Sequence, residues 1–156
     1  MKKFFLVIVL VMFSMPALAT STLTCTQTNQ IFGNGHGYKT VCTVTADSGG
    51  TTFNTLLLPV GLGGQYLYML ITVPGGTAPT VDTDLVINMD SATGPDILGG
   101  SGANMVDNAT TNAWRPTVNS VAASVPIYGD LYVGVSNNSV TNATFTLYLL
   151  TVPQIP

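Results

Sequence analysis

The chain has 156 residues, of which 46% are hydrophobic and only 7% are charged, and its formal net charge at pH 7 is −3. So many apolar residues argue against a disordered chain, because they can be buried in a folded core. With only four Lys and Arg, the chain cannot neutralise a nucleic-acid backbone, so we expect no nucleic acid among its partners.

At the front of the chain, residues 1–19 have the three parts of an export signal. Lys2 and Lys3 provide positive charge, residues 4–13 are an unbroken apolar run, and residues 17–19 read Ala-Leu-Ala, which is typical of a cleavage site. The apolar run is short for a bilayer, and no second stretch of about 18 apolar residues follows it. We therefore expect cleavage after Ala19, a periplasmic or extracellular location, and no membrane contact after cleavage. An uncleaved anchor is the alternative.

The part that follows the predicted signal, residues 20–156, is long enough for one domain and too short for two. It holds Lys39 and Arg115 against seven Asp, a formal charge of 2 − 7 = −5, and the chain contains no Glu. Thr, Val, Asn and Gly are abundant, whereas an exposed helix would need Glu, Lys, Gln and Ala. The composition therefore predicts strands and turns, and no helix is expected.

The first two strands are expected to form a hairpin. They are the Thr-rich segments Ser21–Gln30 and Lys39–Ala46. A turn centred on Gly33-Asn34 would join them, since these two residues accept positive φ at little cost.

The register of this hairpin predicts a disulfide bond. With the turn at Gly33-Asn34, Cys25 lies opposite Cys42 and Leu23 lies opposite Val44, so two independent pairings agree. Export to an oxidising compartment makes the bond chemically reasonable. Two buried free thiols are the alternative.

Apolar segments separated by turn residues predict the strands that follow. Tyr66–Val73 is apolar at nearly every position and is expected to be a central strand, while Leu85–Asp90 alternates, with Asn88 and Asp90 on a solvated side. Three more strands are expected: Thr52–Val60, a strand with Ile127, Leu131, Val133 and Val135 on one face, and a last strand with Phe145, Leu147 and Leu149 on one face and Thr144, Thr146 and Tyr148 opposite. The predicted turns are Asp47–Gly50, Gly61–Gly64, Pro74–Pro79 and Asn137-Asn138.

The pattern is less regular between these strands. Residues 90–104 form a polar, Gly-rich excursion in which Ile97-Leu98 is expected to tuck back onto the core. Between Met105 and Pro126 we expect a covering loop, with Trp114 and Val118 packed over one open end. Seven or eight short strands predict an all-β fold: a single antiparallel β-sandwich of jelly-roll or immunoglobulin-like type, with a small barrel as the alternative.

The order and spacing of several motifs resemble a known family. These motifs are Pro74–Thr80, Asp84–Asp90, Gly94–Gly100, Asn104, Pro126–Leu131, Val135–Asn137 and Ala143–Leu149. Over about residues 44–150, their succession is similar to small structural proteins encoded in the virion modules of tailed bacteriophages. The resemblance implies a compact, non-enzymatic β-sandwich that takes part in particle structure or decoration, with no catalytic residues to carry over. The leader and the cysteine hairpin depart from that family's pattern and leave open a related domain reused as an exported protein.

Few residues offer chemistry for catalysis or metal binding. His36 is the single histidine and has no acidic neighbour in sequence. Asp82 and Asp84 would point to the same face of an extended segment, as paired carboxylates do in glycosidases, but solvated turn residues explain them better. Asp90 and Asp96 bracket a turn whose oxygens could gather around calcium, although the segment lacks the ligand pattern of an EF-hand. We therefore expect no enzyme, no catalytic residue and no cofactor, with a hydrolase built on paired Asp as a less favoured alternative.

The aromatic residues raise sugar binding as a further possibility. Alternation places Tyr66 and Tyr68 on one face and Tyr128 and Tyr132 on one face, although core packing is the commoner reason for such pairs. The leading expectation is a non-enzymatic structural or interaction protein, a virion-like accessory or decoration subunit with an export leader, which contacts itself or a particle surface. The alternative is a secreted carbohydrate- or calcium-binding module.

Overall fold

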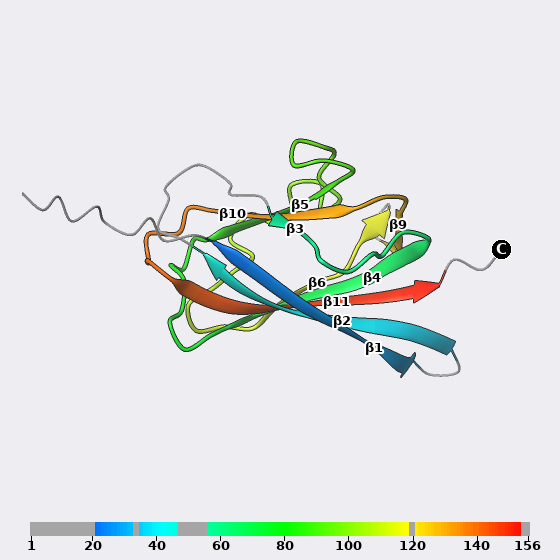
Figure 1. Cartoon of the computed structure of the whole chain (residues 1–156), viewed down its shortest axis with the longest axis horizontal. Helices are drawn as coiled ribbons and strands as arrows, with labels where there is room; N and C mark the ends of the chain where they lie inside the picture. The colour runs from blue at the N-terminus through cyan, green and yellow to red at the C-terminus, as the bar shows by residue number, and fades with distance from the viewer. Residues whose placement is uncertain (1–20, 33–34, 47–55, 119–120, 154–156) are drawn as a thin grey trace, which may run out of the picture.

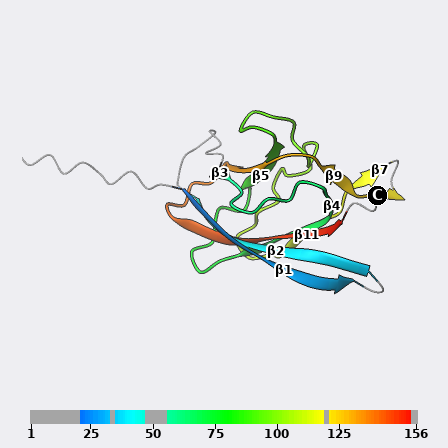
Figure 2. The same ribbon diagram turned by 45° about the vertical axis from the view of Figure 1, so that its right-hand side comes forward.

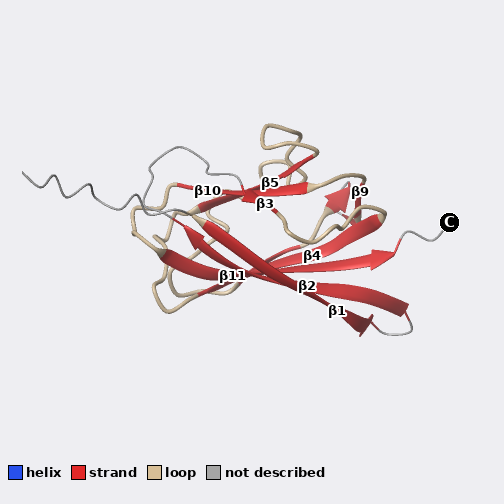
Figure 3. Ribbon diagram, in the orientation of Figure 1, coloured by secondary structure: helices blue, strands red, loops and turns tan. Residues whose placement is uncertain are grey.

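The computed structural model describes residues 21–32, 35–46, 56–118 and 121–153. Within these ranges the backbone forms eleven strands and no helix, so the predicted all-β class is confirmed (Figure 3). No helix in this part of the chain is long and apolar enough to cross a membrane. The predicted leader and the predicted turns at Gly33-Asn34 and Asp47–Gly50 lie outside the described residues.

A large antiparallel sheet, here called the main sheet, forms one layer of the molecule. Its strands are, from one edge to the other, β1 (Thr22–Phe32), β2 (Gly35–Ala46), β11 (Ala143–Pro153), β4 (Gln65–Pro74) and β6 (Asn112–Trp114), and β9 (Val125–Ile127) also pairs with β4. The central position of β4 confirms the prediction made from its continuous apolar character.

A smaller antiparallel sheet forms the second layer. It contains β3 (Leu56–Leu57), β10 (Leu131–Ser136) and β5 (Asp84–Met89) in that order, and a separate hairpin pairs β7 (Thr117–Val118) with β8 (Val121–Ala122). The two sheets lie one above the other in Figure 1 and stay distinct in the turned view of Figure 2. The main sheet begins at β1 and ends at β6, so the described strands do not close into the small barrel that the sequence also allowed.

Side chains from both sheets fill the space between them. Phe145, Leu147 and Leu149 of β11 are buried, as their alternation predicts. Ile87 of β5 and Val133 of β10 belong to the same hydrophobic cluster from the small sheet. Burying a large apolar side chain contributes about 1.5–3 kcal/mol, so the contact between the two layers is the main source of stability.

Two predictions about the second half of the chain are wrong in part. Ile127 and Leu131 do not share a strand, because β9 pairs with β4 in the main sheet and β10 pairs with β5 in the small one. Trp114 lies in β6 opposite Leu70 and extends the main sheet, so it does not belong to a loop over an open end. Both β6 and β9 have only three residues, too few to show a period in the sequence.

The predicted strand Thr52–Val60 is also shorter in the part that the structure describes. Leu56 and Leu57 pair with β10, and the N–H of Leu58 donates to Leu131 O of that strand at 2.7 Å. Val118, expected in the covering loop, belongs to the β7–β8 hairpin. The turn at Asn137 is confirmed, because that residue has a positive φ of 57°.

The excursion after β5 lies along that strand and covers it. Leu98 is only 3% exposed, and Ile97 N donates to Ile87 O at 2.8 Å, so the prediction that this pair tucks back onto the core is confirmed. The solvated side predicted for β5 is wrong at Asn88, which is 8% exposed. Its Nδ2 donates to Ala92 O at 2.6 Å, so the excursion itself removes this polar side chain from water.

Candidate functional site

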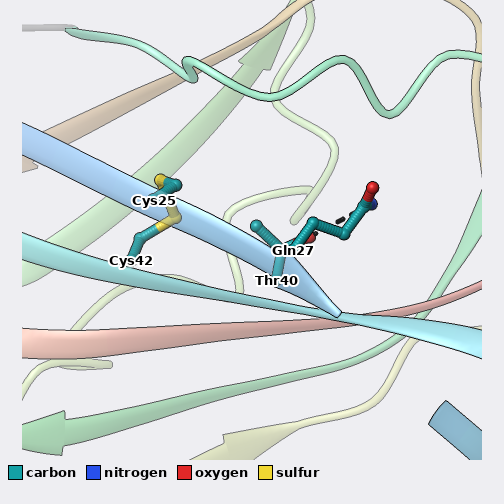
Figure 4. Close-up of a disulfide and its surroundings, with 4 residues drawn as sticks. All are labelled: Cys25, Gln27, Thr40 and Cys42. Atoms are coloured by element: carbon teal, nitrogen blue, oxygen red, sulfur yellow. Dashed lines mark hydrogen bonds between the residues drawn. A yellow bond between two sulfur atoms is a disulfide. The ribbon is translucent and has the colours of Figure 1, made fainter. Parts of the chain in front are cut away.

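The cysteine hairpin is a structural device at the edge of the main sheet. The strands β1 and β2 pair in the predicted register, and Cys25 and Cys42 form the predicted disulfide, with their Cα atoms 4.0 Å apart (Figure 4). The alternative of two free thiols is therefore wrong. Beside the bond, Gln27 Nε2 donates to Thr40 Oγ1 at 3.4 Å. These contacts hold the two strands together, and the bonded sulfurs offer no nucleophile.

Asp96, a candidate calcium ligand, is engaged by the backbone of its own loop. Its Oδ1 accepts the N–H of Leu98 at 3.0 Å and of Ile87 at 3.3 Å, and its Oδ2 accepts the N–H of Gly100 at 2.9 Å. The carboxylate thus anchors the excursion to β5. Because N–H donors fill the directions in which a cation would bind, the arrangement serves as a brace.

Asp90, the other calcium candidate, lies at the opposite end of that loop. It has a positive φ of 70°, its side chain is exposed, and its N–H donates to Asp130 O at 2.9 Å. Its carboxylate lies against Gly129, where an added Cβ would be 1.8 Å from Asp90 Oδ1. Within the described ranges, no three His, Cys, Asp or Glu side chains form a group that could hold a metal ion.

The other titratable candidates are also kept apart. Asp84 Oδ1 accepts the N–H of Asn104 at 2.8 Å, and its Oδ2 accepts a hydrogen bond from the side chain of Asn137. Asp82 is exposed just before β5, so one carboxylate of the pair ties two loops together while the other stays in water. His36 is exposed on β2, opposite Ile31.

The outer face of the main sheet, which points away from the small sheet, is apolar over its central strands. We define it by the half-exposed side chains that alternate with core residues: Val41 of β2, Tyr148, Leu150 and Val152 of β11, and Tyr66, Met69, Ile71 and Val73 of β4. The strand register makes them neighbours, with Tyr148 opposite both Val41 and Ile71. None of the described segments forms a layer over them. Large contiguous apolar surfaces are typical of sites where proteins meet partners.

Two hollows lie along this face. The larger, about 420 Å³, is lined by Lys39, Ile71, Val73, Tyr148 and Leu150, and we call it the Lys39 groove. The second, about 400 Å³, is lined by Tyr66, Ser124, Val152 and Pro153. They follow one another along β11, because Leu150 and Val152 are two residues apart on the same side of the strand.

Both cations that follow the predicted leader lie over aromatic rings of the main sheet. Lys39 Nζ is 4.6 Å from the centre of the Tyr148 ring, and Arg115 Cζ is 4.3 Å from the centre of the Tyr68 ring. A cation held on a ring face keeps its charge and can still meet an anion from outside.

The predicted tyrosine pairs are only partly brought together. Tyr66 lies on the outer face, whereas Tyr68 is the extra residue at an irregularity, since Leu150 pairs with Met69 and the next residue of β11 pairs with Leu67. Tyr128 and Tyr132 do not share a face, because the chain changes layer between β9 and β10.

Sequence reasoning missed the Lys39 groove. The signal was present in β4, which is apolar on both of its faces, and in the second half of β11. A strand of this type is expected to be covered on both sides, and here the described structure covers one.

Comparison of the chain with protein-family models, with curated proteins and with solved structures finds no match.

Proposed function

We propose that the chain is a non-enzymatic structural and interaction protein that works by contacting other proteins through the outer face of its main sheet. In this view it is an exported accessory or decoration subunit of the virion type, used in many copies. The observation that carries the proposal is the apolar outer face itself. Single apolar residues at the surface are ordinary, but eight partly exposed ones side by side on three strands form a continuous apolar surface, which favours a partner.

The character of the face favours a protein partner. The Lys39 groove is lined by aliphatic and aromatic side chains, which fit apolar side chains of another protein. The described carboxylates contribute to loops, as Asp96 and Asp84 do, and are not arranged around a substrate. A role in contacting another protein therefore accounts for the apolar groove and for the carboxylates, whereas a catalytic role accounts for neither.

A secreted carbohydrate-binding module is the second candidate. Tyr66 and Tyr148 present rings on the same outer face, each at the wall of a hollow, and aromatic rings of this kind can stack on sugars. Retention of the protein on a glycan array, lost when Tyr66 becomes Ala, would favour this candidate over the first.

The first candidate is tested by fractionating the native protein from producing cells on a density gradient. We expect it to sediment with large particles, and we expect the double variant Ile71→Thr with Leu150→Thr to remain at the top. This variant keeps side chains that suit strands while removing apolar surface. The matched control is Val81→Thr with Val121→Thr, which changes exposed apolar residues elsewhere. If wild type and both variants all stay at the top, the proposal is wrong.

A further inference from the structure

The cations and the carboxylates of the described chain lie in different parts of the fold. The cations Lys39 and Arg115 lie over rings of the main sheet. The six described carboxylates all lie outside the strands of that sheet, in loops or on β5: they are Asp82, Asp84, Asp90, Asp96, Asp107 and Asp130. A partner for the outer face should therefore bring its own carboxylates.

We propose that the partner which fills the Lys39 groove is a second copy of this chain, bound head to tail. The segment inserted is the Tyr128 corner, which we define as Tyr128, Asp130 and Asp90. This inference rests on the proposed function and names the partner of the same outer face.

The Tyr128 corner has the shape and charge of a groove ligand. Tyr128 is 71% exposed, so its ring lies largely in solvent. Its N–H donates to Met89 Sδ at 3.4 Å, which fixes the backbone beneath the ring. Asp90 N donates to Asp130 O at 2.9 Å, so the two exposed acidic residues are held beside each other. An aromatic ring thus projects next to two carboxylates.

The Lys39 groove offers the complementary arrangement. It is an open hollow of about 420 Å³, and its apolar walls suit a tyrosine ring. Lys39 stands at the wall over Tyr148, where its ammonium could meet the carboxylate of Asp130. Aromatic anchors in pockets, flanked by complementary charges, typically dominate the binding energy of an interface.

The two surfaces belong to different parts of the fold. The groove opens on the side of the main sheet that points away from the small sheet, whereas Tyr128 follows β9 where the chain passes to β10. A head-to-tail pair would therefore keep one groove and one corner unoccupied, and further copies would add in series to form a ring or a filament. A two-fold contact centred on the Lys39 groove would instead bring the Lys39 side chains of both copies together without a carboxylate, which disfavours it.

The test is a complementation experiment by sedimentation velocity. Wild type should form species larger than a monomer as its concentration rises. Lys39→Glu blocks the groove by repelling Asp130, and Tyr128→Ser removes the projecting ring; each variant alone should weaken association at least about tenfold, a loss typical of a central interface residue. Val121→Ser, a change at a residue that is 67% exposed on β8, should leave association unchanged.

The decisive sample is the equimolar mixture of the two variants. Lys39→Glu keeps an intact corner and Tyr128→Ser keeps an intact groove, so the mixture should form a 1:1 dimer that grows no further. Thermal melts of each variant establish that it is folded. A wild type that stays monomeric at every concentration, or a mixture that forms no dimer, would overturn the inference. If such a monomer still sediments with particles, the proposed function stands and only the identity of the partner is wrong.

Discussion

Among single residues, Asp96 was a candidate calcium ligand, but its carboxylate instead accepts hydrogen bonds from the backbone of its own loop. In the sequence, its carboxylate follows Asp90 at a spacing that suits a hard cation. In the structure, three backbone N–H groups converge on it, from Ile87, Leu98 and Gly100. The pattern of residue types could not reveal this, because the donors belong to the backbone and their direction depends on the path of the loop.

We expect Asp96→Asn to lower the free energy of unfolding by about 1–3 kcal/mol, because it weakens charge-assisted hydrogen bonds and turns an acceptor into a donor. Chemical denaturation measures the change. Asp82→Asn is the matched control, since Asp82 is exposed, and it should stay within about 0.5 kcal/mol of wild type. Equal losses at the two positions would show that Asp96 does not brace the loop.

The disulfide was predictable from the sequence because a hairpin register fixes which residues face each other. Cys25→Ser should lower stability by about 2–4 kcal/mol under oxidising conditions, since the bond limits the unfolded chain. A thermal melt of the wild type with and without reductant gives the same comparison without a substitution. Identical midpoints would show that the bond adds nothing.

Among elements, β1 lies at the edge of the main sheet, and the geometry of its disulfide shows which of its backbone N–H groups point away from β2. A Cα separation of 4.0 Å marks Cys25 and Cys42 as a pair without mutual backbone hydrogen bonds, so the N–H of Cys25 points away from β2. Because N–H directions alternate along this regular register, the N–H of Asn29 also points away from β2, and the N–H of Thr28 points toward β2.

Proline substitutions test this alternation, because proline has no backbone N–H to donate. Thr28→Pro should remove a hydrogen bond of the β1–β2 ladder and lower stability by about 1–3 kcal/mol. Asn29→Pro places the missing N–H at the free edge, where proline is tolerated, and should cost clearly less. The two variants are compared by thermal melting. If Asn29→Pro lowers stability as much as Thr28→Pro, the N–H directions assigned to these two residues are wrong.

The strands also show what a period in the sequence can reveal. Long strands such as β4 and β11 were predicted because six or more of their residues carry a clear pattern. The short β6 and β9 were missed, because their pairing with β4 depends on contacts between distant segments. The same apolar pattern that located β4 correctly also contained the outer face, but a pattern cannot tell which side of a strand is covered.

For the whole molecule, the two-layer arrangement follows from the alternation of apolar side chains, and the crossing between layers does not. The chain leaves the main sheet after Ile127 and enters the small sheet at Leu131, over three residues. One run of apolar residues at even spacing therefore became two strands. That crossing is also what exposes Tyr128, so the Tyr128 corner was beyond the reach of sequence reasoning.

The central claim, that this protein acts by contact through the outer face of its main sheet, is tested most directly by hydroxyl-radical footprinting of its side chains. Labelling is compared between dilute protein and protein recovered with its partners or assembled at high concentration. We predict that labelling of Tyr148, Ile71 and Leu150 falls on assembly, while the exposed Val81 on another surface is labelled equally in both states. Unchanged labelling of the outer face in the assembled protein would contradict the account.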